Sequence, residues 1–416
     1  MQKAKSFSIS KHLVAEAWNR IRSNGGSAGI DNQSLLNFER DLKGNLYRIW
    51  NRMSSGSYMP SPVKLVEIPK NGDGSRPLGI PTVSDRVAQM VVVLLLEPCL
   101  EKVFHQDSYG YRPGRSAHDA LSIARTRCWK YDWVLDMDIK GFFDNINHEL
   151  LSKALLRHTN ERWMLLYIQR WLEVPYERSN GERIELTQGV PQGSVIGPVL
   201  ANLFLHYAFD EWMSRNHPEV PFERYADDTI CHCRTKEEAE KMKEVIQERL
   251  NSCGLELNGS KTKIVYCKDS NRRGNHTAIK FDFLGYTFRP RKAENKAKQY
   301  FVSFLPAISD KAKKRIGERM RSWWRTSRTN IGLKEIAAWL NPTIQGWVNY
   351  YAKFYKTEIY GLLERLNQRL IIWVTKKYKR FRGRTTRARE WLGMFAKNNP
   401  TLFAHWRFGI RPLKTN

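Results

Sequence analysis

Two short acidic segments constrain this 416-residue chain more than any other feature. Tyr225-Ala226-Asp227-Asp228 lies between runs typical of strands, so residues 223–233 are expected to form a strand, a tight turn and a second strand. About 90 residues earlier, a predicted strand over 133–139 contains Asp136 and Asp138. Carboxylates gathered at the tip of a hairpin repel one another unless a cation lies between them. The pattern therefore favours a divalent-cation site over a solvated turn.

Carboxylates in this arrangement suit phosphoryl transfer. Two divalent ions held about 3.5–4 Å apart activate an attacking hydroxyl and stabilise a leaving phosphate. Oxygen ligands favour Mg²⁺, with Mn²⁺ as an alternative, over zinc. The six cysteines contain no Cys-x-x-Cys pair, which argues against a structural zinc module.

The charge of the chain predicts a polyanionic partner. Its formal net charge is +27, and residues 311–416 carry +20 of it, with 25 Lys and Arg against 5 Glu. Within this region residues 376–384 interleave cations with aromatic side chains, which suits phosphate contact together with base stacking. The longest apolar run, Met90 to Leu96, is far shorter than the roughly 20 residues of a membrane span. We therefore expect a nucleic-acid partner and no membrane.

Several further motifs occur in the order in which reverse transcriptases carry them, and the chain resembles that family over nearly its whole length. The blocks are Ile68-Pro69-Lys70 with Arg76-Pro77-Leu78-Gly79-Ile80-Pro81, then residues 108–116, 188–194 and 254–258 with Lys261-Thr262, and finally Phe283-Leu284-Gly285-Tyr286. The opening Gly29-Ile30-Asp31 and the segment 344–351 (Ile-Gln-Gly-Trp-Val-Asn-Tyr-Tyr) are similar to those of group II intron-encoded, non-LTR-type bacterial enzymes. One residue departs from the family pattern, because Gly197 stands before Pro198 where a Ser is usual.

The resemblance implies an α+β fold of the right-hand polymerase type, with fingers and an RRM-like palm followed by an all-α thumb or maturase domain. The expected boundaries are 1–60 for an N-terminal extension and 61–300 for fingers and palm. A helical thumb/maturase (X) domain is expected over 301–375, and a short basic nucleic-acid-binding segment over 376–416. Because no cysteine lies beyond Cys267, the zinc-dependent HNH endonuclease of some relatives is expected to be absent.

The resemblance also assigns roles to individual residues. Asp138, Asp227 and Asp228 are the predicted catalytic and metal-binding carboxylates, and the Ile139 carbonyl is a further metal ligand. The residues expected to bind the nucleotide are Lys70, Arg76, Phe143, Gln192 and Lys261, where Phe143 would exclude a 2′-hydroxyl and Lys261 would neutralise or protonate pyrophosphate. The residues expected to bind nucleic acid are Arg112, Lys376, Lys377, Lys379, Arg380, Arg382 and Arg384. Asp144 is interpreted as a helix cap rather than a ligand.

The implied function is that of an RNA-directed DNA polymerase and intron maturase. Its partners would be group II intron RNA, an RNA template with a DNA primer, deoxynucleoside triphosphates (dNTPs) and target DNA. The expected location is the bacterial cytoplasm, where the protein could associate with the nucleoid. Two alternatives stay open: a free-standing reverse transcriptase serving defence or DNA repair, and an RNA-binding maturase that acts only in splicing.

Overall fold

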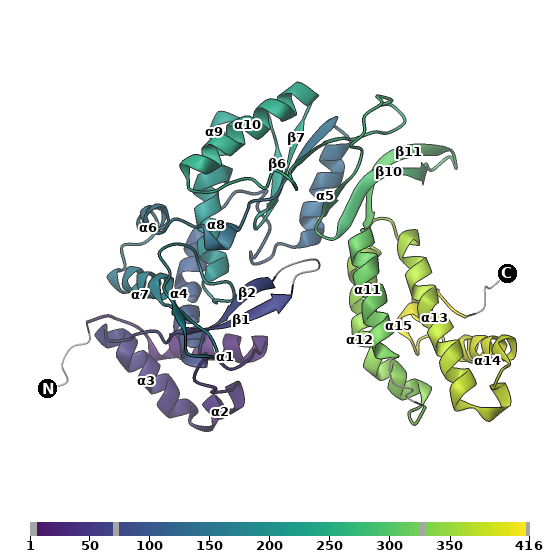
Figure 1. The fold of residues 1–416 in the computed structure, drawn as a ribbon, viewed down its shortest axis with the longest axis horizontal. Coiled ribbons are helices and arrows are strands. Elements are labelled where there is room, and N and C mark those ends of the chain that lie inside the picture. The colour runs from purple at the N-terminus through teal and green to yellow at the C-terminus, as the bar shows by residue number, and fades with distance from the viewer. Residues whose placement is uncertain (1–5, 70–74, 325–328, 413–416) are drawn as a thin grey trace. The chain divides into compact units, whose positions relative to one another are not determined.

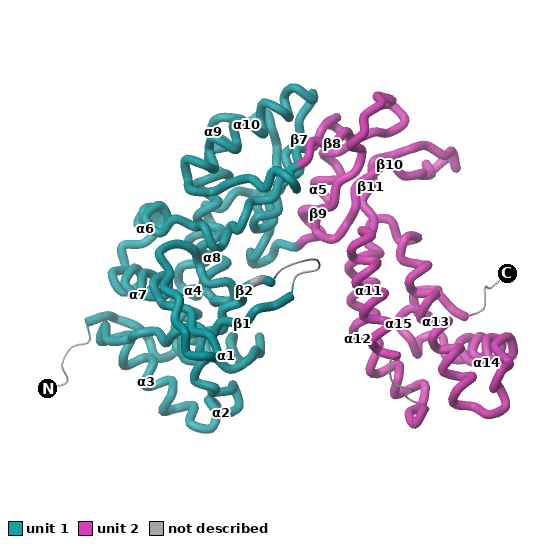
Figure 2. The backbone as a smooth tube through the Cα atoms, in the orientation of Figure 1, with its two compact units in different colours: residues 1–116, 135–262 teal, residues 117–134, 263–416 magenta. Residues whose placement is uncertain are grey.

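The computed structural model describes residues 6–69, 75–324 and 329–412 (Figure 1). The chain divides into two compact units (Figure 2). Unit 1 comprises residues 1–116 and 135–262, and unit 2 comprises residues 117–134 and 263–416. Both contain helices and strands, so the predicted α+β class is confirmed. In the described parts of the chain, none of the helices is long and apolar enough to cross a membrane.

Unit 1 begins with helices and continues with strands and helices in alternation. Its first part contains α1 (Lys11–Asn24), α2 (Leu35–Arg40), α3 (Leu42–Ser55), β1 (Val63–Pro69), β2 (Ser75–Ile80) and α4 (Val83–Leu100). Its second part contains β3 (Trp133–Met137, which begins in unit 2), the 3₁₀ turn η1 (Phe142–Asp144), α6 (His148–Leu156), α7 (Arg162–Glu173), β4 (Tyr176–Glu177), β5 (Arg183–Ile184), α8 (Gly197–Leu205), the π-helical turn η2 (His206–Asp210), α9 (Glu211–Asn216), β6 (Phe222–Tyr225), β7 (Asp228–Cys233) and α10 (Lys236–Ser252).

The strands of unit 1 form two groups. One sheet has the order β2-β1-β4-β5, in which β1 pairs antiparallel with β2 and parallel with β4. The β1–β2 pair flanks the Asn-Gly-Asp-Gly sequence at 71–74, which predicts a turn between two strands. Residues 71–74 themselves lie outside the described residues. In the second sheet the strands of this unit follow the order β6-β7-β3, which makes β7 the neighbour of the Asp-bearing strand β3.

The apolar helix α4 packs inside unit 1 and also fixes the start of α8. Gln89 of α4 is 2% exposed, and its side-chain oxygen accepts hydrogen bonds from the backbone N–H groups of Val195 (2.8 Å) and Ile196 (3.4 Å). These donors precede the first turn of α8, where backbone N–H groups have no partner within the helix. Gln89 therefore anchors the loop that carries the predicted nucleotide-binding Gln192.

Unit 2 contains one sheet and a set of helices. Its elements are α5 (Ala117–Cys128), β8 (Lys263–Tyr266), β9 (Phe281–Phe283), β10 (Tyr286–Glu294), β11 (Tyr300–Ile308), α11 (Asp310–Trp323), α12 (Leu333–Tyr351), α13 (Thr357–Lys377), the 3₁₀ turn η3 (Lys379–Phe381), α14 (Thr385–Asn398) and α15 (Ala404–Arg407). Its sheet has the order β11-β10-β9, and β10 and β11 form a long hairpin (Figure 1).

Two details of unit 2 differ from the sequence-based expectations. The aromatic residues of 281–288 predict a single strand, but this segment forms a hairpin, because Leu284 (φ 50°) and Gly285 (φ 77°) turn the chain between β9 and β10. Residues 301–308, placed at the start of the helical domain, instead complete β11, and the helices begin at Asp310.

The C-terminal segment folds into η3, α14 and α15, with a buried polar centre. His405 is fully buried, its Nε2 lies 2.8 Å from the side-chain oxygen of Asn367, and Trp406 Nε1 donates to the same oxygen at 2.9 Å. Because that oxygen only accepts, Nε2 carries the imidazole proton. Burial lowers the pKa of His405 to about 3, so the ring is neutral in the folded chain.

Candidate functional site

The hairpin β6–β7 presents Asp227 and Asp228 at its tip. The strands pair from Phe222 opposite Cys231 to Tyr225 opposite Asp228, which leaves Ala226 and Asp227 as the turn. Ala226 has φ 57°, a left-handed conformation that residues with a side chain seldom adopt. Asp227 is half-buried and Asp228 is exposed. The predicted strand, tight turn and strand are confirmed, with the two carboxylates at the bend.

A buried arginine holds this turn in place. Arg224 is fully buried and donates to both carboxylate oxygens of Asp210, at 2.7 and 2.6 Å. The same guanidinium donates to the Asn202 side chain (3.0 Å), to the Ser108 hydroxyl (2.8 Å) and to the carbonyl of Ala226 (3.1 Å). Five hydrogen bonds from the planar Arg224 guanidinium thus connect Ala226, the turn residue with the left-handed conformation, to η2 and α8.

The loop that contains Tyr109 and Gly110 approaches the turn closely. The backbone N–H of Tyr109 donates to the Arg224 carbonyl at 2.8 Å. A Cβ at Gly110 would lie 2.4 Å from the backbone nitrogen of Ala226, so only glycine fits there. The motif at 108–116 therefore contributes to the site through its backbone.

The second acidic segment follows β3 and is held by the loop 254–262. The Asp138 carbonyl accepts from the N–H of Asn258 at 2.7 Å, and the next residue, Ile139, forms a bridge with Leu257. The Asp138 carboxylate accepts from Lys261 Nζ at 2.9 Å, with 27% of the Asp138 side chain exposed. The Lys261 ammonium therefore balances the Asp138 charge, a contact that the sequence did not predict.

Among the described residues, no group of three or more His, Cys, Asp and Glu side chains is arranged to hold a metal ion. The donors nevertheless fit Mg²⁺ by type, since Asp138, Asp227, Asp228 and the Ile139 carbonyl offer oxygen alone. Ile139 is itself buried, at 7% exposed. The metal assignment of these four residues stays a prediction.

The predicted nucleotide-binding residues on η1 and on the loop 188–194 lie next to each other. The carbonyl of Phe143, whose side chain is 8% exposed, accepts from the N–H of Val190 at 2.7 Å. Gln192 donates from its side chain to Asp144 at 3.0 Å, and its carbonyl accepts from the N–H of Gly79 on β2 at 2.7 Å. The two loops and β2 thus form one connected surface.

Two further residues of this region are Asp144 and Gly197. Asp144 does not cap α6, because Asn147 is the N-cap and accepts from the N–H of Leu150 at 2.9 Å. At Gly197 a Cβ would lie 2.6 Å from the Ser194 hydroxyl. Glycine in place of the usual serine therefore fits the close packing of this loop.

The remaining two residues predicted to bind the nucleotide are Arg76 and Lys70. The backbone of Arg76 lies on β2 opposite Ile68. Lys70 lies outside the described residues. Their roles stay predictions.

The prediction that Arg112 binds nucleic acid is wrong. Its side chain is 4% exposed and forms a bidentate pair with Glu101, at 3.1 and 2.9 Å. Its remaining nitrogen donates to the carbonyls of His105 and Ser108, each at 2.7 Å. The guanidinium has no surface left for a phosphate, so Arg112 stabilises the loop before the 108–116 motif.

The basic residues predicted to bind nucleic acid near the end of the chain fall into two groups. Lys377 donates to the carbonyls of Thr329 (2.9 Å) and Ile331 (2.7 Å), so its ammonium serves the fold. Arg380 lies 4.7 Å from the ring centre of Phe381, an exposed cation stacked on an aromatic ring. The other predicted cations are exposed: Lys376, Lys379, Arg382 and Arg384.

Sequence comparisons agree with this arrangement. Residues 68–288 match the family described as reverse transcriptase (RNA-dependent DNA polymerase), and residues 313–391 match the group II intron maturase-specific domain. Protein YkfC of Escherichia coli (strain K12) is 30% identical over 332 residues, covering 70% of this chain and 84% of that protein. The group II intron-encoded protein LtrA of Lactococcus lactis subsp. cremoris is 34% identical over 193 residues, covering 46% of this chain and 32% of LtrA.

A solved structure of telomerase from Candida albicans with a fragment of telomeric RNA aligns with a TM-score of 0.47 at 11% identity, covering 92% of this chain and 69% of that chain. The family match spans more than half of the 416 residues. The chain therefore belongs to the reverse transcriptases and carries the maturase-specific domain of group II intron proteins.

The sequence patterns did not identify Arg224 and Asp210, the buried ion pair that positions the turn. A signal was present, since Arg224 stands inside the otherwise strand-like segment Phe222-Glu223-Arg224-Tyr225. A charged residue in a buried strand needs a paired partner. The partner lies 14 residues away in sequence and could not be chosen without the fold.

Proposed function

We propose that this chain copies RNA into DNA from the 3′-hydroxyl of a primer, and that it binds group II intron RNA, promoting its splicing and its reverse transcription for retrohoming. The observation that carries the proposal is the carboxylate hairpin. Asp227 and Asp228 lie at a turn fixed by Arg224, within the region that matches the reverse transcriptases. The maturase-specific match at 313–391 supports the splicing role.

We propose Mg²⁺ as the cofactor, with Mn²⁺ as an alternative, held by Asp138, Asp227, Asp228 and the Ile139 carbonyl. Divalent ions there supply activation of the primer hydroxyl and neutralisation of the leaving pyrophosphate. The chain itself orients the carboxylates through Arg224 and balances Asp138 through Lys261. Phe143 and Gln192, joined to β2 by the loop 188–194, would form the nucleotide-facing surface.

The substrates in this proposal are an RNA template with a DNA primer, dNTPs and target DNA. The exposed cations Lys376, Lys379, Arg380, Arg382 and Arg384 would bind phosphates of the RNA or DNA. We place fingers and palm at 61–300 and the maturase domain at 301–375, with β11 as its first element. The proposed location is the bacterial cytoplasm, at or near the nucleoid.

Paired assays on one preparation test both roles. Asp227→Asn should abolish primer extension while splicing of a group II intron transcript continues. If the wild-type chain splices without extending primers, the splicing-only alternative holds and the polymerase proposal fails. If it extends primers without stimulating splicing, the maturase role fails and the free-standing alternative gains support.

A further inference from the structure

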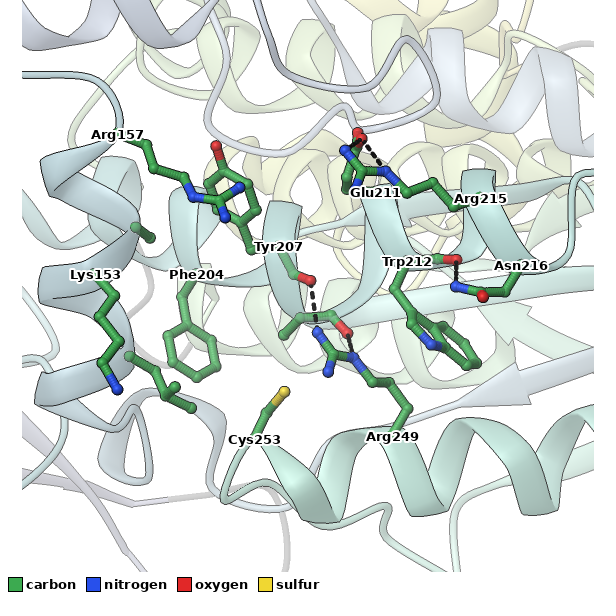
Figure 3. A pocket seen from close by; sticks show the side chains of 13 residues that line it. Lys153, Arg157, Phe204, Tyr207, Glu211, Trp212, Arg215, Asn216, Arg249 and Cys253 are labelled. Carbon is green, nitrogen blue, oxygen red and sulfur yellow. Dashed lines mark hydrogen bonds and ion pairs between the residues drawn. The ribbon is translucent and has the colours of Figure 1, made fainter.

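Unit 1 contains a pocket whose lining residues include none of those predicted for polymerisation. The pocket lies among α6, the α8–η2–α9 segment and α10, and its volume is about 360 Å³ (Figure 3). That volume falls within the range of small-molecule sites. Its rim carries Lys153 of α6 and Arg157, the residue that follows α6, and its lining includes Tyr207, Trp212 and Arg249.

The cations around the pocket differ in whether a partner neutralises them. Arg215 pairs with Glu211 at 2.7 Å. Lys153 and Arg157 are exposed, and no ion pair joins either side chain to another described residue. Lys153 lies in the last turn of α6 and Arg157 is the residue that ends it, four positions later, a spacing at which like charges repel by roughly a few tenths of a kcal/mol. Two uncompensated cations one helical turn apart at the rim are suited to an anion such as a phosphate.

The wall that η2 and α9 contribute is aromatic and held in a fixed shape. The π-helical turn η2 bonds the N–H of Glu211 to the carbonyl of His206, which leaves neighbouring carbonyls in need of donors. Arg249 supplies them, donating to the carbonyls of Tyr207 (2.9 Å) and Ala208 (3.0 Å). His158 lies 2.8 Å from the Tyr207 hydroxyl, so the Tyr207 ring is anchored at its outer end.

Arginine and aromatic groups already associate at this wall. The Arg157 guanidinium lies 5.2 Å from the ring centre of Tyr207, which keeps the cation at the mouth of the pocket. Trp212 is half-buried and its side chain lies beside Arg249 (Figure 3). An aromatic surface beside cations is the combination with which proteins bind single-stranded nucleic acid, through base stacking and phosphate contact.

We propose that this pocket binds a nucleotide, with the base against the aromatic wall and the phosphate at Lys153 and Arg157. The inference deepens the proposed function, because it rests on the chain being an RNA-binding protein and adds a contact outside the polymerase site. The nucleotide could belong to an unpaired RNA segment or be a free mononucleotide. An acidic peptide would use the same cations but would not need a planar aromatic wall.

The test compares the full-length wild type with the double variant Lys153→Gln/Arg157→Gln. Lys241→Gln is the matched control, because Lys241 is an exposed lysine on α10 that does not line the pocket. The probes are a labelled, unstructured 12-nucleotide RNA, AMP and a labelled Glu-rich peptide. A 12-nucleotide RNA carrying 4-thiouridine is cross-linked to the wild type, and the attachment sites are mapped by mass spectrometry.

We expect the double variant to bind the RNA about tenfold more weakly. The slope of log K against log salt should fall in magnitude by about 0.7–1.4, because one or two phosphate contacts are lost. Lys241→Gln should bind like the wild type, and cross-links should lie within 148–157 or 206–216. AMP binding that disappears in the double variant supports a free nucleotide as ligand. Weakened RNA binding without measurable AMP binding supports a nucleotide within a strand.

Unchanged RNA binding by the double variant, with cross-links elsewhere, would overturn the proposal. So would a preference of the pocket for the Glu-rich peptide. Primer extension by the wild-type preparation is recorded in parallel. A wild type that extends primers while the pocket variant binds RNA normally refutes this inference alone, whereas a wild type that does not extend primers refutes the proposed polymerase.

Discussion

Replacing Asp210 with Asn should destabilise the unit that carries the carboxylate hairpin by about 3–5 kcal/mol, the usual cost of breaking one side of a buried ion pair. Both side chains of the pair are 0% exposed, so water cannot solvate the Arg224 guanidinium once its partner is neutral. A loss of this size is a large part of the roughly 5–15 kcal/mol by which a domain is stable.

The assay is urea unfolding followed by tryptophan fluorescence, with primer extension measured on the same preparations. Glu211→Gln is the control, because it breaks a neighbouring pair between the half-buried Glu211 and the exposed Arg215, and should change the free energy of unfolding by less than about 1 kcal/mol. A destabilisation below 1 kcal/mol for Asp210→Asn would refute the reasoning on burial.

The paired variant Asp210→Leu/Arg224→Met separates stability from positioning. Apolar replacement of both partners often restores stability. It also removes the donor to the Ala226 carbonyl, so primer extension should stay impaired while the unfolding free energy recovers. Full recovery of primer extension would show that the turn does not depend on Arg224.

Three further predictions concern other contacts. Lys261→Met should lower the Mg²⁺ concentration for half-maximal primer extension by up to about fivefold, because the exposed Lys261 ammonium of the wild type competes with Mg²⁺ for the Asp138 carboxylate. An unchanged Mg²⁺ titration would contradict this prediction. The depressed pKa of His405 means that the unfolded chain binds a proton below about pH 6.5 that the folded chain accepts only near pH 3. Stability should therefore fall by about 2 kcal/mol between pH 7 and pH 5 in denaturant titrations, and His405→Gln should flatten that dependence. Arg112→Lys should lower the free energy of unfolding by about 2–3 kcal/mol, because it loses the bidentate contact with Glu101. The salt dependence of RNA binding, measured by fluorescence anisotropy, should stay that of the wild type.

Local sequence patterns predicted the elements whose structure depends on neighbouring residues. The strand, tight turn and strand around Asp227 follow from alternation and from a two-residue turn, and both are local signals. The hairpin β9–β10 was mistaken for one strand, because the turn at Leu284-Gly285 is short and bounded by aromatic residues that favour strands.

Contacts between residues far apart in sequence could not be predicted. Lys261 reaches Asp138 across 123 positions and Arg224 reaches Ser108 across 116, and no periodicity encodes either pairing. Arg112 was misassigned for the same reason. A basic residue in a family motif resembles a phosphate ligand until the fold brings Glu101 beside it.

The most direct test of the proposed polymerase site is primer extension by Asp227→Asn on an RNA template. The control is Asp41→Asn, which changes an exposed carboxylate in a different part of unit 1. The substitution keeps the shape of the side chain and removes its charge. Asp227→Asn should lose extension at every Mg²⁺ concentration while binding RNA as tightly as the wild type, and Asp41→Asn should extend normally. Extension by Asp227→Asn at the wild-type rate would show that Asp227 is not a catalytic carboxylate.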